Sequence, residues 1–143
     1  MTLHPAEALW ADIQATLRPD ALQTDAGDFD YLAVDERIEK WPVIREGSVP
    51  RRMPAQFVYE GKASGQGQTV DWQLASSYAE RGRMILAGGL SVDNVAEAIS
   101  IVHPFGVDVS SAVESRPGVK DPRRIKDFVQ ASKAALRDTG SNA

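Results

Sequence analysis

The segment RMILAGGLS, residues 83–91, decides the fold class of this chain. Residues 84–87 are apolar and are followed by two glycines, a pattern typical of a buried strand that ends in a tight turn. Ser91 can cap a helix, and apolar residues recur at helical spacing from Val92 to Val102. The segment therefore predicts a strand, a turn and a helix in immediate succession, which is the repeating unit of α/β folds.

The same alternation extends in both directions along the chain. Four further short apolar runs are strand candidates: 21–23, 42–45, 56–59 and 106–109. Three further stretches are helix candidates: 5–17, 72–81 and 121–136. The stretch 28–34 fits either a short helix or a loop. Five strands alternating with helices predict a parallel sheet in an α/β fold, and no linker divides the chain into two domains.

The first and last helix candidates show their expected inner faces. Leu9, Ile13 and Leu17 recur at four-residue steps in the first, with Trp10 beside them. The last begins at Asp121 and Pro122, a good cap and first-turn pair. Its expected inner face contains Ile125, Phe128, Val129, Ser132 and Leu136, and residues 137–143 are expected to form a disordered tail.

Composition excludes several functional classes. The 143 residues include 16 Lys+Arg and 20 Asp+Glu, and the resulting net charge of −4 disfavours nucleic acid and anionic membranes as partners. No apolar run approaches the roughly 20 residues of a membrane-spanning helix, and the first residues lack the pattern of a secretory signal. We therefore expect a cytoplasmic protein.

Cys and His, the usual ligands of zinc, are absent or rare in this chain. The chain contains no Cys, which excludes disulfides, thiolate catalysis and Cys-ligated zinc. His4 and His103 are far apart in sequence and lack metal-ligand spacing, so we expect no metal site and assign neither residue a role. The three Trp residues fit packing better than substrate stacking.

Three turns that follow strand candidates could bind a phosphate. They are the loop 64–69 with Gly67, the pair Gly88-Gly89 and the pair Ser110-Ser111. Each also has an ordinary interpretation, as a loop glycine, a tight turn and a capping pair. However, turns of this kind after two successive strands match the usual phosphate site of a (β/α)₈ barrel, so together they favour phosphate binding.

Two carboxylates accompany these turns. Glu60 ends the third strand candidate, where it could be a general acid or a solvated strand-end group. Asp108 lies between Val107 and Val109 in the fifth, where it could contact a substrate or anchor the neighbouring turn by hydrogen bonds.

Three segments resemble the phosphoribosylanthranilate isomerase family in order and spacing: MILAGGLSVDNV at 84–95, GVDVSSAVES at 106–115 and PGVKD at 117–121. A Gly-rich loop ending in an Asp-Trp pair, 65–72, and the segment 18–23 extend the resemblance over nearly the whole chain. The resemblance implies an isomerase of tryptophan biosynthesis, which converts N-(5′-phosphoribosyl)anthranilate by an Amadori rearrangement. The ligand is thus a small sugar phosphate, and no cofactor is needed.

The resemblance also implies roles for particular residues. Glu60 stands where the family has its acid, an Asp at the end of the sixth barrel strand. Phosphate contacts carry over to Gly88, Gly89, Ser110 and Ser111, and Asp108 and Arg45 match positions near the substrate.

Two positions depart from the family pattern. Gln23-Thr24-Asp25-Ala26 replaces the family's QLHG, so its His and Gly are gone. Ala112 replaces the Gly that usually follows the two serines.

Length sets the last expectation, because a full (β/α)₈ barrel takes about 250 residues. The five strand candidates match barrel strands four to eight, so we expect residues 1–143 to form one incomplete barrel domain. The family's general base is a Cys on the first strand, and its absence predicts that the chain alone is inactive. The alternative is a non-catalytic phosphate-binding or assembly fragment that needs an N-terminal partner piece or self-associates. Indole-glycerol-phosphate synthase, another barrel of the same pathway, is disfavoured because no strand candidate ends in Lys.

Overall fold

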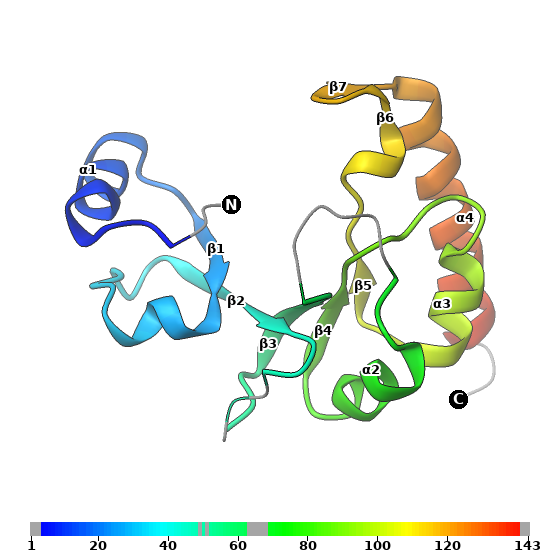
Figure 1. The fold of residues 1–143 in the computed structure, drawn as a ribbon, viewed down its shortest axis with the longest axis horizontal. Helices are drawn as coiled ribbons and strands as arrows, with labels where there is room; N and C mark the ends of the chain where they lie inside the picture. Colours follow the sequence, from blue (N-terminus) through cyan, green and yellow to red (C-terminus); the bar gives the residue numbers. More distant parts are fainter. Residues whose placement is uncertain (1–3, 49, 51, 63–68, 141–143) are drawn as a thin grey trace.

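The computed structural model describes residues 4–48, 50, 52–62 and 69–140 and has a five-stranded parallel sheet at its centre (Figure 1). The sheet order follows the chain, and each strand pairs with the next in parallel. The strands are β1 Ala21–Asp25, β2 Glu39–Arg45, β3 Gln56–Glu60, β4 Arg83–Leu86 and β5 Gly106–Val107. All five expected strands are therefore confirmed, with ends that differ by at most three residues.

Helical segments precede and follow the strands: α1 Glu7–Leu17, η1 Ala26–Asp30, α2 Trp72–Ala79, α3 Val95–Val102, η2 Ser111–Val113 and α4 Pro122–Gly140. A short antiparallel hairpin, β6 Glu114–Arg116 and β7 Val119–Lys120, precedes α4. The Asp71 carboxylate caps α2, since it accepts from the Leu74 amide at 3.0 Å. The cap expected at Ser91 is wrong, because α3 begins at Val95 after Asn94, and Val92 lies before the helix and is 48% exposed. The Asp121 carboxylate accepts from the Arg123 amide at 2.8 Å. The expected tail, 137–143, is helical as far as Gly140, and its disorder stays a prediction.

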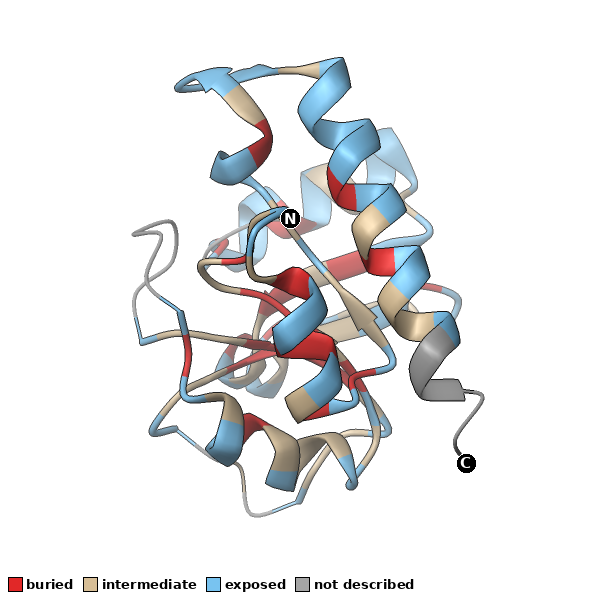
Figure 2. Cartoon of the chain, turned by 90° about the vertical axis from the view of Figure 1, so that its right-hand side faces the viewer, coloured by how far each residue is buried: buried red, intermediate tan, exposed pale blue. Residues whose placement is uncertain are grey.

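The main core lies between one face of the sheet and the helices α2, α3 and α4. Its buried residues alternate along the strands, with Ile44, Phe57, Tyr59, Met84 and Leu86 on this face. Figure 2 shows the buried residues of the strands and helices meeting in this layer. The opposite face carries a smaller cluster formed by Val43, Val58 and Ala87. Alternation thus leaves Arg45 and Glu60 on this second face.

A separate small core joins α1 to β1. It contains Trp10, Leu22, Leu32 and Ile38. The expected stripe on α1 is wrong at two of its positions, because Leu9 is 54% and Leu17 74% exposed whereas Trp10 is buried. The physical reason is that this short helix covers little of the sheet, and the large indole fills the contact while its N–H donates to the Ala33 carbonyl at 3.1 Å.

The inner face of α4 is narrower than the sequence pattern predicts. Phe128 and Ser132 are buried, but Ile125 is 39% and Val129 41% exposed. The larger contacts of α4 are with α3 and η2. These two elements cover only a narrow row of side chains on the helix. The buried Ser132 hydroxyl has a hydrogen-bond partner, because it donates to the Phe128 carbonyl at 2.8 Å.

Candidate active site

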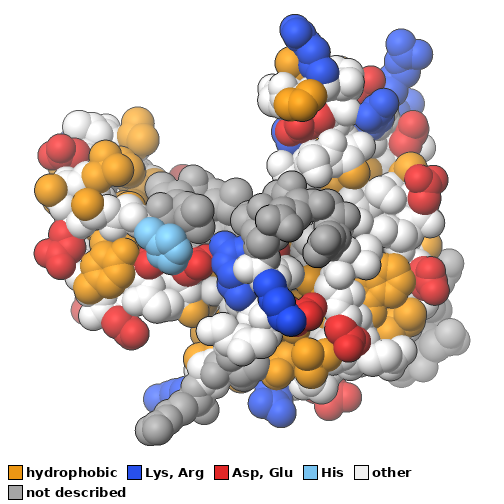
Figure 3. All heavy atoms as spheres, in the orientation of Figure 1, with side chains coloured by type: hydrophobic (Ala, Val, Ile, Leu, Met, Phe, Trp, Pro, Cys, Tyr) orange, Lys and Arg blue, Asp and Glu red, His pale blue; other side chains and the backbone are white. Residues whose placement is uncertain are grey.

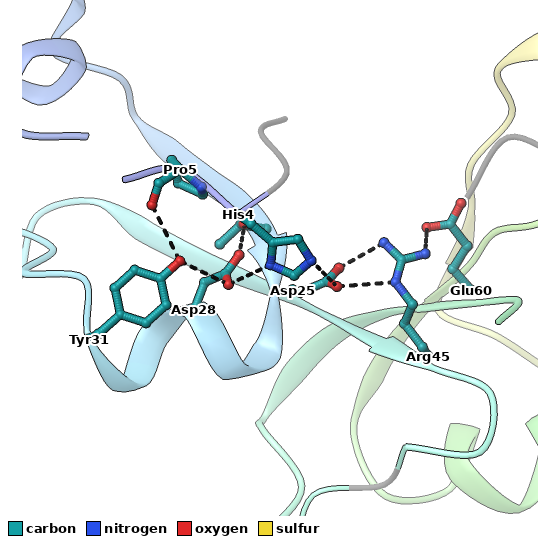
Figure 4. A network of polar contacts seen from close by, with 8 residues as sticks. His4, Pro5, Asp25, Asp28, Tyr31, Arg45 and Glu60 are labelled. Carbon is teal, nitrogen blue, oxygen red and sulfur yellow. Dashed lines mark hydrogen bonds and ion pairs between the residues drawn. The ribbon is translucent and has the colours of Figure 1, made fainter. Parts of the chain in front are cut away.

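Three charged side chains meet at the carboxyl edge of the sheet. Asp25, Arg45 and Glu60 are the last residues of β1, β2 and β3, and parallel pairing brings these ends together. Arg45 donates from Nε and Nη2 to the two oxygens of Asp25, at 3.2 and 2.7 Å. Its Nη1 donates to Oε2 of Glu60 at 3.1 Å. Figure 4 shows Arg45 reaching between the two carboxylates.

The charges in this trio are largely removed from solvent. The side chains are 17% exposed for Arg45, 19% for Asp25 and 14% for Glu60. The hydrogen bond to Asp25 raises the pKa of Arg45, and the charges of both carboxylates add to that effect against the opposing effect of burial. Arg45 thus lies between two carboxyl groups at the place where the sequence predicts the acid.

A second network continues from Asp25 toward the N-terminal segment. Nε2 of His4 lies 3.4 Å from Asp25, and Nδ1 lies 2.9 Å from Asp28 (Figure 4). Asp28 is buried and also accepts from the Thr24 hydroxyl and, at 3.1 Å, from the Tyr31 hydroxyl. This network of contacts therefore links His4 to the site, although the sequence analysis assigned His4 no role.

The pKa values of this network shift in opposite directions. Burial raises the pKa of Asp28, but the hydrogen bonds from Thr24, His4 and Tyr31 together lower it below its ordinary value. The hydrogen bond to Asp28 and its negative charge raise the pKa of His4. The contact is consequently strongest when His4 is protonated and Asp28 is ionised.

The Gly88-Gly89 turn follows β4 at the same edge of the sheet. Both glycines have left-handed backbone angles, φ of 92° and 65°, which L side chains rarely adopt. Asn94 fixes the turn, because its side chain donates to the Gly89 carbonyl at 2.9 Å and accepts from the Ser91 amide at 2.8 Å. The Asp93 amide also donates to the Ser91 hydroxyl, at 3.2 Å, so the turn is held by internal hydrogen bonds before α3 begins at Val95.

The Ser110-Ser111 pair follows β5 on an adjacent part of this edge. Nζ of Lys120 donates to the carbonyl and hydroxyl oxygens of Ser110, at 2.9 and 3.2 Å, and to Glu114 at 2.8 Å. The hydrogen bond from Lys120 lowers the pKa of Glu114. Asp108 lies just after β5 rather than inside it, which corrects the expectation, because only Gly106–Val107 pairs with β4. It is exposed, and its amide donates to the Leu86 carbonyl at 2.9 Å.

A hollow of about 230 Å³ lies beside the last helix. Residues of the connection between β4 and α3, of η2 and of α4 line it, including Ser91, Ala112 and Arg124. Its lining includes the cation of Arg124 and the carboxylates of Asp93 and Asp127, so it carries charges of both signs.

The predicted site residues therefore fall into two groups. Arg45 and Glu60 are in direct contact, and Gly88, Gly89, Ser110 and Ser111 follow the neighbouring strands β4 and β5. Gly67 lies outside the described residues.

Sequence reasoning missed Asp25 and Lys120 as site residues. The signals available were the departure from QLHG at Asp25 and the position of Lys120 in PGVKD.

Within the part of the chain that the structure describes, no group of three or more His, Cys, Asp or Glu residues could hold a metal ion. No helix there is long and apolar enough to cross a membrane.

A known protein family matches most of this chain. The family model described as N-(5′phosphoribosyl)anthranilate (PRA) isomerase matches residues 13–131. The N-(5′-phosphoribosyl)anthranilate isomerase of Solibacter usitatus is 51% identical over 109 residues, which are 76% of this chain and 48% of that protein.

Solved structures of the same kind share the fold. Phosphoribosylanthranilate isomerase from Thermotoga maritima, in a study of monomers generated from the dimeric enzyme, matches with a TM-score of 0.72 and 29% identity. The match covers 93% of this chain and 70% of that one. An isomerase in complex with reduced 1-(o-carboxyphenylamino)-1-deoxyribulose 5-phosphate matches with a TM-score of 0.68 and 28% identity, over 93% and 69% of the two chains.

The matches differ in how much of each protein they include. This chain spans between a third and a half of the length of curated relatives that it matches, 33% for the protein of Pelobacter propionicus and 48% for that of Solibacter usitatus.

Proposed function

This chain belongs to the N-(5′-phosphoribosyl)anthranilate isomerase family, and we propose that it provides barrel strands four to eight of such an isomerase, as one incomplete domain over residues 1–143. The proposed reaction converts N-(5′-phosphoribosyl)anthranilate to 1-(2-carboxyphenylamino)-1-deoxyribulose 5-phosphate in tryptophan biosynthesis. The observation that carries the proposal is the position of Glu60, a mostly buried carboxyl group at the carboxyl end of β3, on the same sheet edge as the Gly88-Gly89 and Ser110-Ser111 turns.

Glu60 is the proposed general acid. It donates a proton to the ribose ring oxygen, the bond from C1 to that oxygen breaks, and the aniline nitrogen forms an imine with C1. A base then removes the proton from C2, and the enolamine that results becomes the ketone. Because the rearrangement is redox-neutral and moves only protons, it needs proton donors and acceptors rather than a redox cofactor.

The phosphate of the substrate is proposed to bind across the two turns. The amides of Gly88 and Gly89 and the hydroxyls of Ser110 and Ser111 are suited to its oxygens. Lys120, which bonds to both Ser110 and Glu114, places a cation beside the second turn. Arg45 and Asp108 complete the proposed substrate contacts.

The base is the missing part of this mechanism. The family resemblance assigns it to a Cys on the first barrel strand, and the chain contains no Cys. We therefore propose that this chain alone does not turn over substrate and that it becomes active when strands one to three are provided by another piece.

The test is an assay of substrate consumption by the full chain, alone and mixed with the first three βα units of the Solibacter usitatus relative. We expect turnover only in the mixture. Glu60→Gln should lower that turnover roughly 10²- to 10⁴-fold, whereas Glu60→Asp, which restores the family's residue, should retain it. Glu97→Gln, on the exposed surface of α3, is the matched control. A Glu60→Gln mixture as active as the unchanged one would refute the role of Glu60.

A non-catalytic phosphate-binding fragment is the second candidate, and the absence of Cys favours it. Inorganic phosphate should then perturb the amide NMR signals of the two turns, and Ser110→Ala should weaken that binding. Ser100→Ala, a serine exposed on α3, should leave it unchanged. Phosphate binding without turnover in any mixture would support this candidate over the isomerase.

A further inference from the structure

Arg45 is shared unequally between two carboxylates. Asp25 receives two of its hydrogen bonds in a paired geometry, and Glu60 receives one. An arginine can serve both because its guanidinium carries five donors in a fixed plane, which a lysine ammonium does not. The side chain of Arg45 is fixed mainly by Asp25, so the orientation of the donor that reaches Glu60 depends on Asp25.

The shared cation couples the two carboxylates electrostatically. All three side chains are mostly buried, and interactions between such charges are screened less than those at an open surface. Among the described residues, His4 also lies 3.4 Å from Asp25, and His4 in turn contacts Asp28. A positive charge held against Glu60 favours its ionised form, while the nearby negative charge of Asp25 opposes this.

We propose that Asp25 is a positioning residue that divides the charge of Arg45 and thereby keeps Glu60 able to hold the proton that ring opening requires. This inference rests on the proposed function of Glu60 as an acid. Without the Asp25 charge, the Arg45 fork is released to pair fully with Glu60. The carboxyl group then holds its proton less readily, and the acid is weakened although it remains in place.

The experiment is a pH titration of the full chain labelled with ¹³C at the side-chain carboxyl groups, with Glu60 assigned by its loss in Glu60→Gln. Asp25→Asn should move the Glu60 midpoint to lower pH by about one unit, a tenfold change in proton affinity. Arg45→Gln should move it to higher pH. Asp30→Asn removes the same charge from an exposed site on η1 and should move it by less than about 0.2 units.

The unsubstituted protein provides a second test, which does not depend on whether a variant folds. Because interacting groups titrate as a pair, the Glu60 signal should show a second inflection at the midpoint of Asp25. An Asp25→Asn midpoint equal to or above that of the unchanged chain overturns the proposal. If Asp25→Asn does not fold, independent titration of the two signals overturns it. None of these titrations requires catalytic turnover. Failure of the isomerase proposal is therefore distinguishable, because the mixture would then be inactive while Asp25 and Glu60 still titrated as a coupled pair.

Discussion

His4 and Asp28 form a contact whose strength depends on pH. The raised pKa of His4 stabilises the fold below its ordinary value of 6.5, and this contribution is lost as pH rises through the raised pKa. The lowered pKa of Asp28 stabilises the fold above its ordinary value of 3.8, and this contribution is lost as pH falls through the lowered pKa. Both contributions are therefore present together between these two ordinary values.

His4→Gln should consequently lower the Tm most in mildly acidic solution. We expect a larger deficit near pH 5.5 than near pH 9, measured by thermal unfolding of both chains at the two values. His103→Gln, at the left-handed C-cap of α3, is the control and should change the Tm equally at both. A His4→Gln deficit that does not shrink at the higher pH would contradict the charge-based explanation.

Thr24 is the buried partner that stabilises the Asp28 carboxylate. Its hydroxyl donates to Asp28, and Thr24→Val keeps the shape but leaves a buried acceptor without this donor. We expect a loss of about 1–3 kcal/mol in the free energy of unfolding, measured with urea. Thr16→Val, at an exposed position of α1, should cost much less, and equal losses would contradict the importance of the hydrogen bond to Asp28.

At the scale of elements, the turn between α2 and β4 depends on a close backbone approach. A Cβ added to Gly82 would lie 2.9 Å from the carbonyl oxygens of both Pro54 and Ala55. Since backbone cannot move aside cheaply, Gly82→Ala should destabilise the fold by about 1–3 kcal/mol in urea unfolding. Gly27→Ala meets nothing within 4 Å and should be nearly neutral. A neutral Gly82→Ala would show that the segment before β3 shifts freely.

The strands were predictable because each is a short apolar run buried on at least one face. The buried faces of the helices were less predictable. Periodicity indicates which side of a helix is apolar, but it does not indicate how much of that side a neighbouring element covers. On α4 the pattern included Val129, which remains exposed, and on α1 it favoured Leu9 over the buried Trp10.

Part of the candidate site was predictable for a similar reason. Glu60 and Arg45 stand at strand ends that any parallel sheet brings to one edge. The contact of His4 with Asp28 was not predictable, because it depends on a left-handed backbone at His4, φ of 46°, that turns the N-terminal segment back toward β1.

At the scale of the whole molecule, the sheet has two edges and an uneven surface. β1 and β5 each pair on one side only among the described residues. Leu9, Leu17 and Tyr31 are exposed on α1 and beside η1, and Figure 3 shows hydrophobic side chains gathered over this lobe. Unpaired strand edges and exposed apolar groups promote association.

We therefore expect the isolated chain to self-associate in a concentration-dependent manner. Light scattering across a dilution series should show a mass that rises with concentration, and adding the piece with strands one to three should replace it with a one-to-one complex. A constant monomer mass at every concentration, together with a single cooperative melt, would contradict this expectation.

The separation of the two apolar cores has a consequence for internal motion. The cluster around Trp10 is small and lies apart from the larger one behind β3 and β4, and Arg45 bonds from β2 to Asp25 on the lobe of the smaller cluster. Local opening is least costly where few apolar contacts must be lost. Amide protons of α1 and β1 should exchange with deuterium well before those of β3 and β4, and each such opening would release Arg45 to Glu60 alone. The proton affinity of Glu60 would then change with each local opening of this lobe, although the lobe contains none of the proposed phosphate contacts.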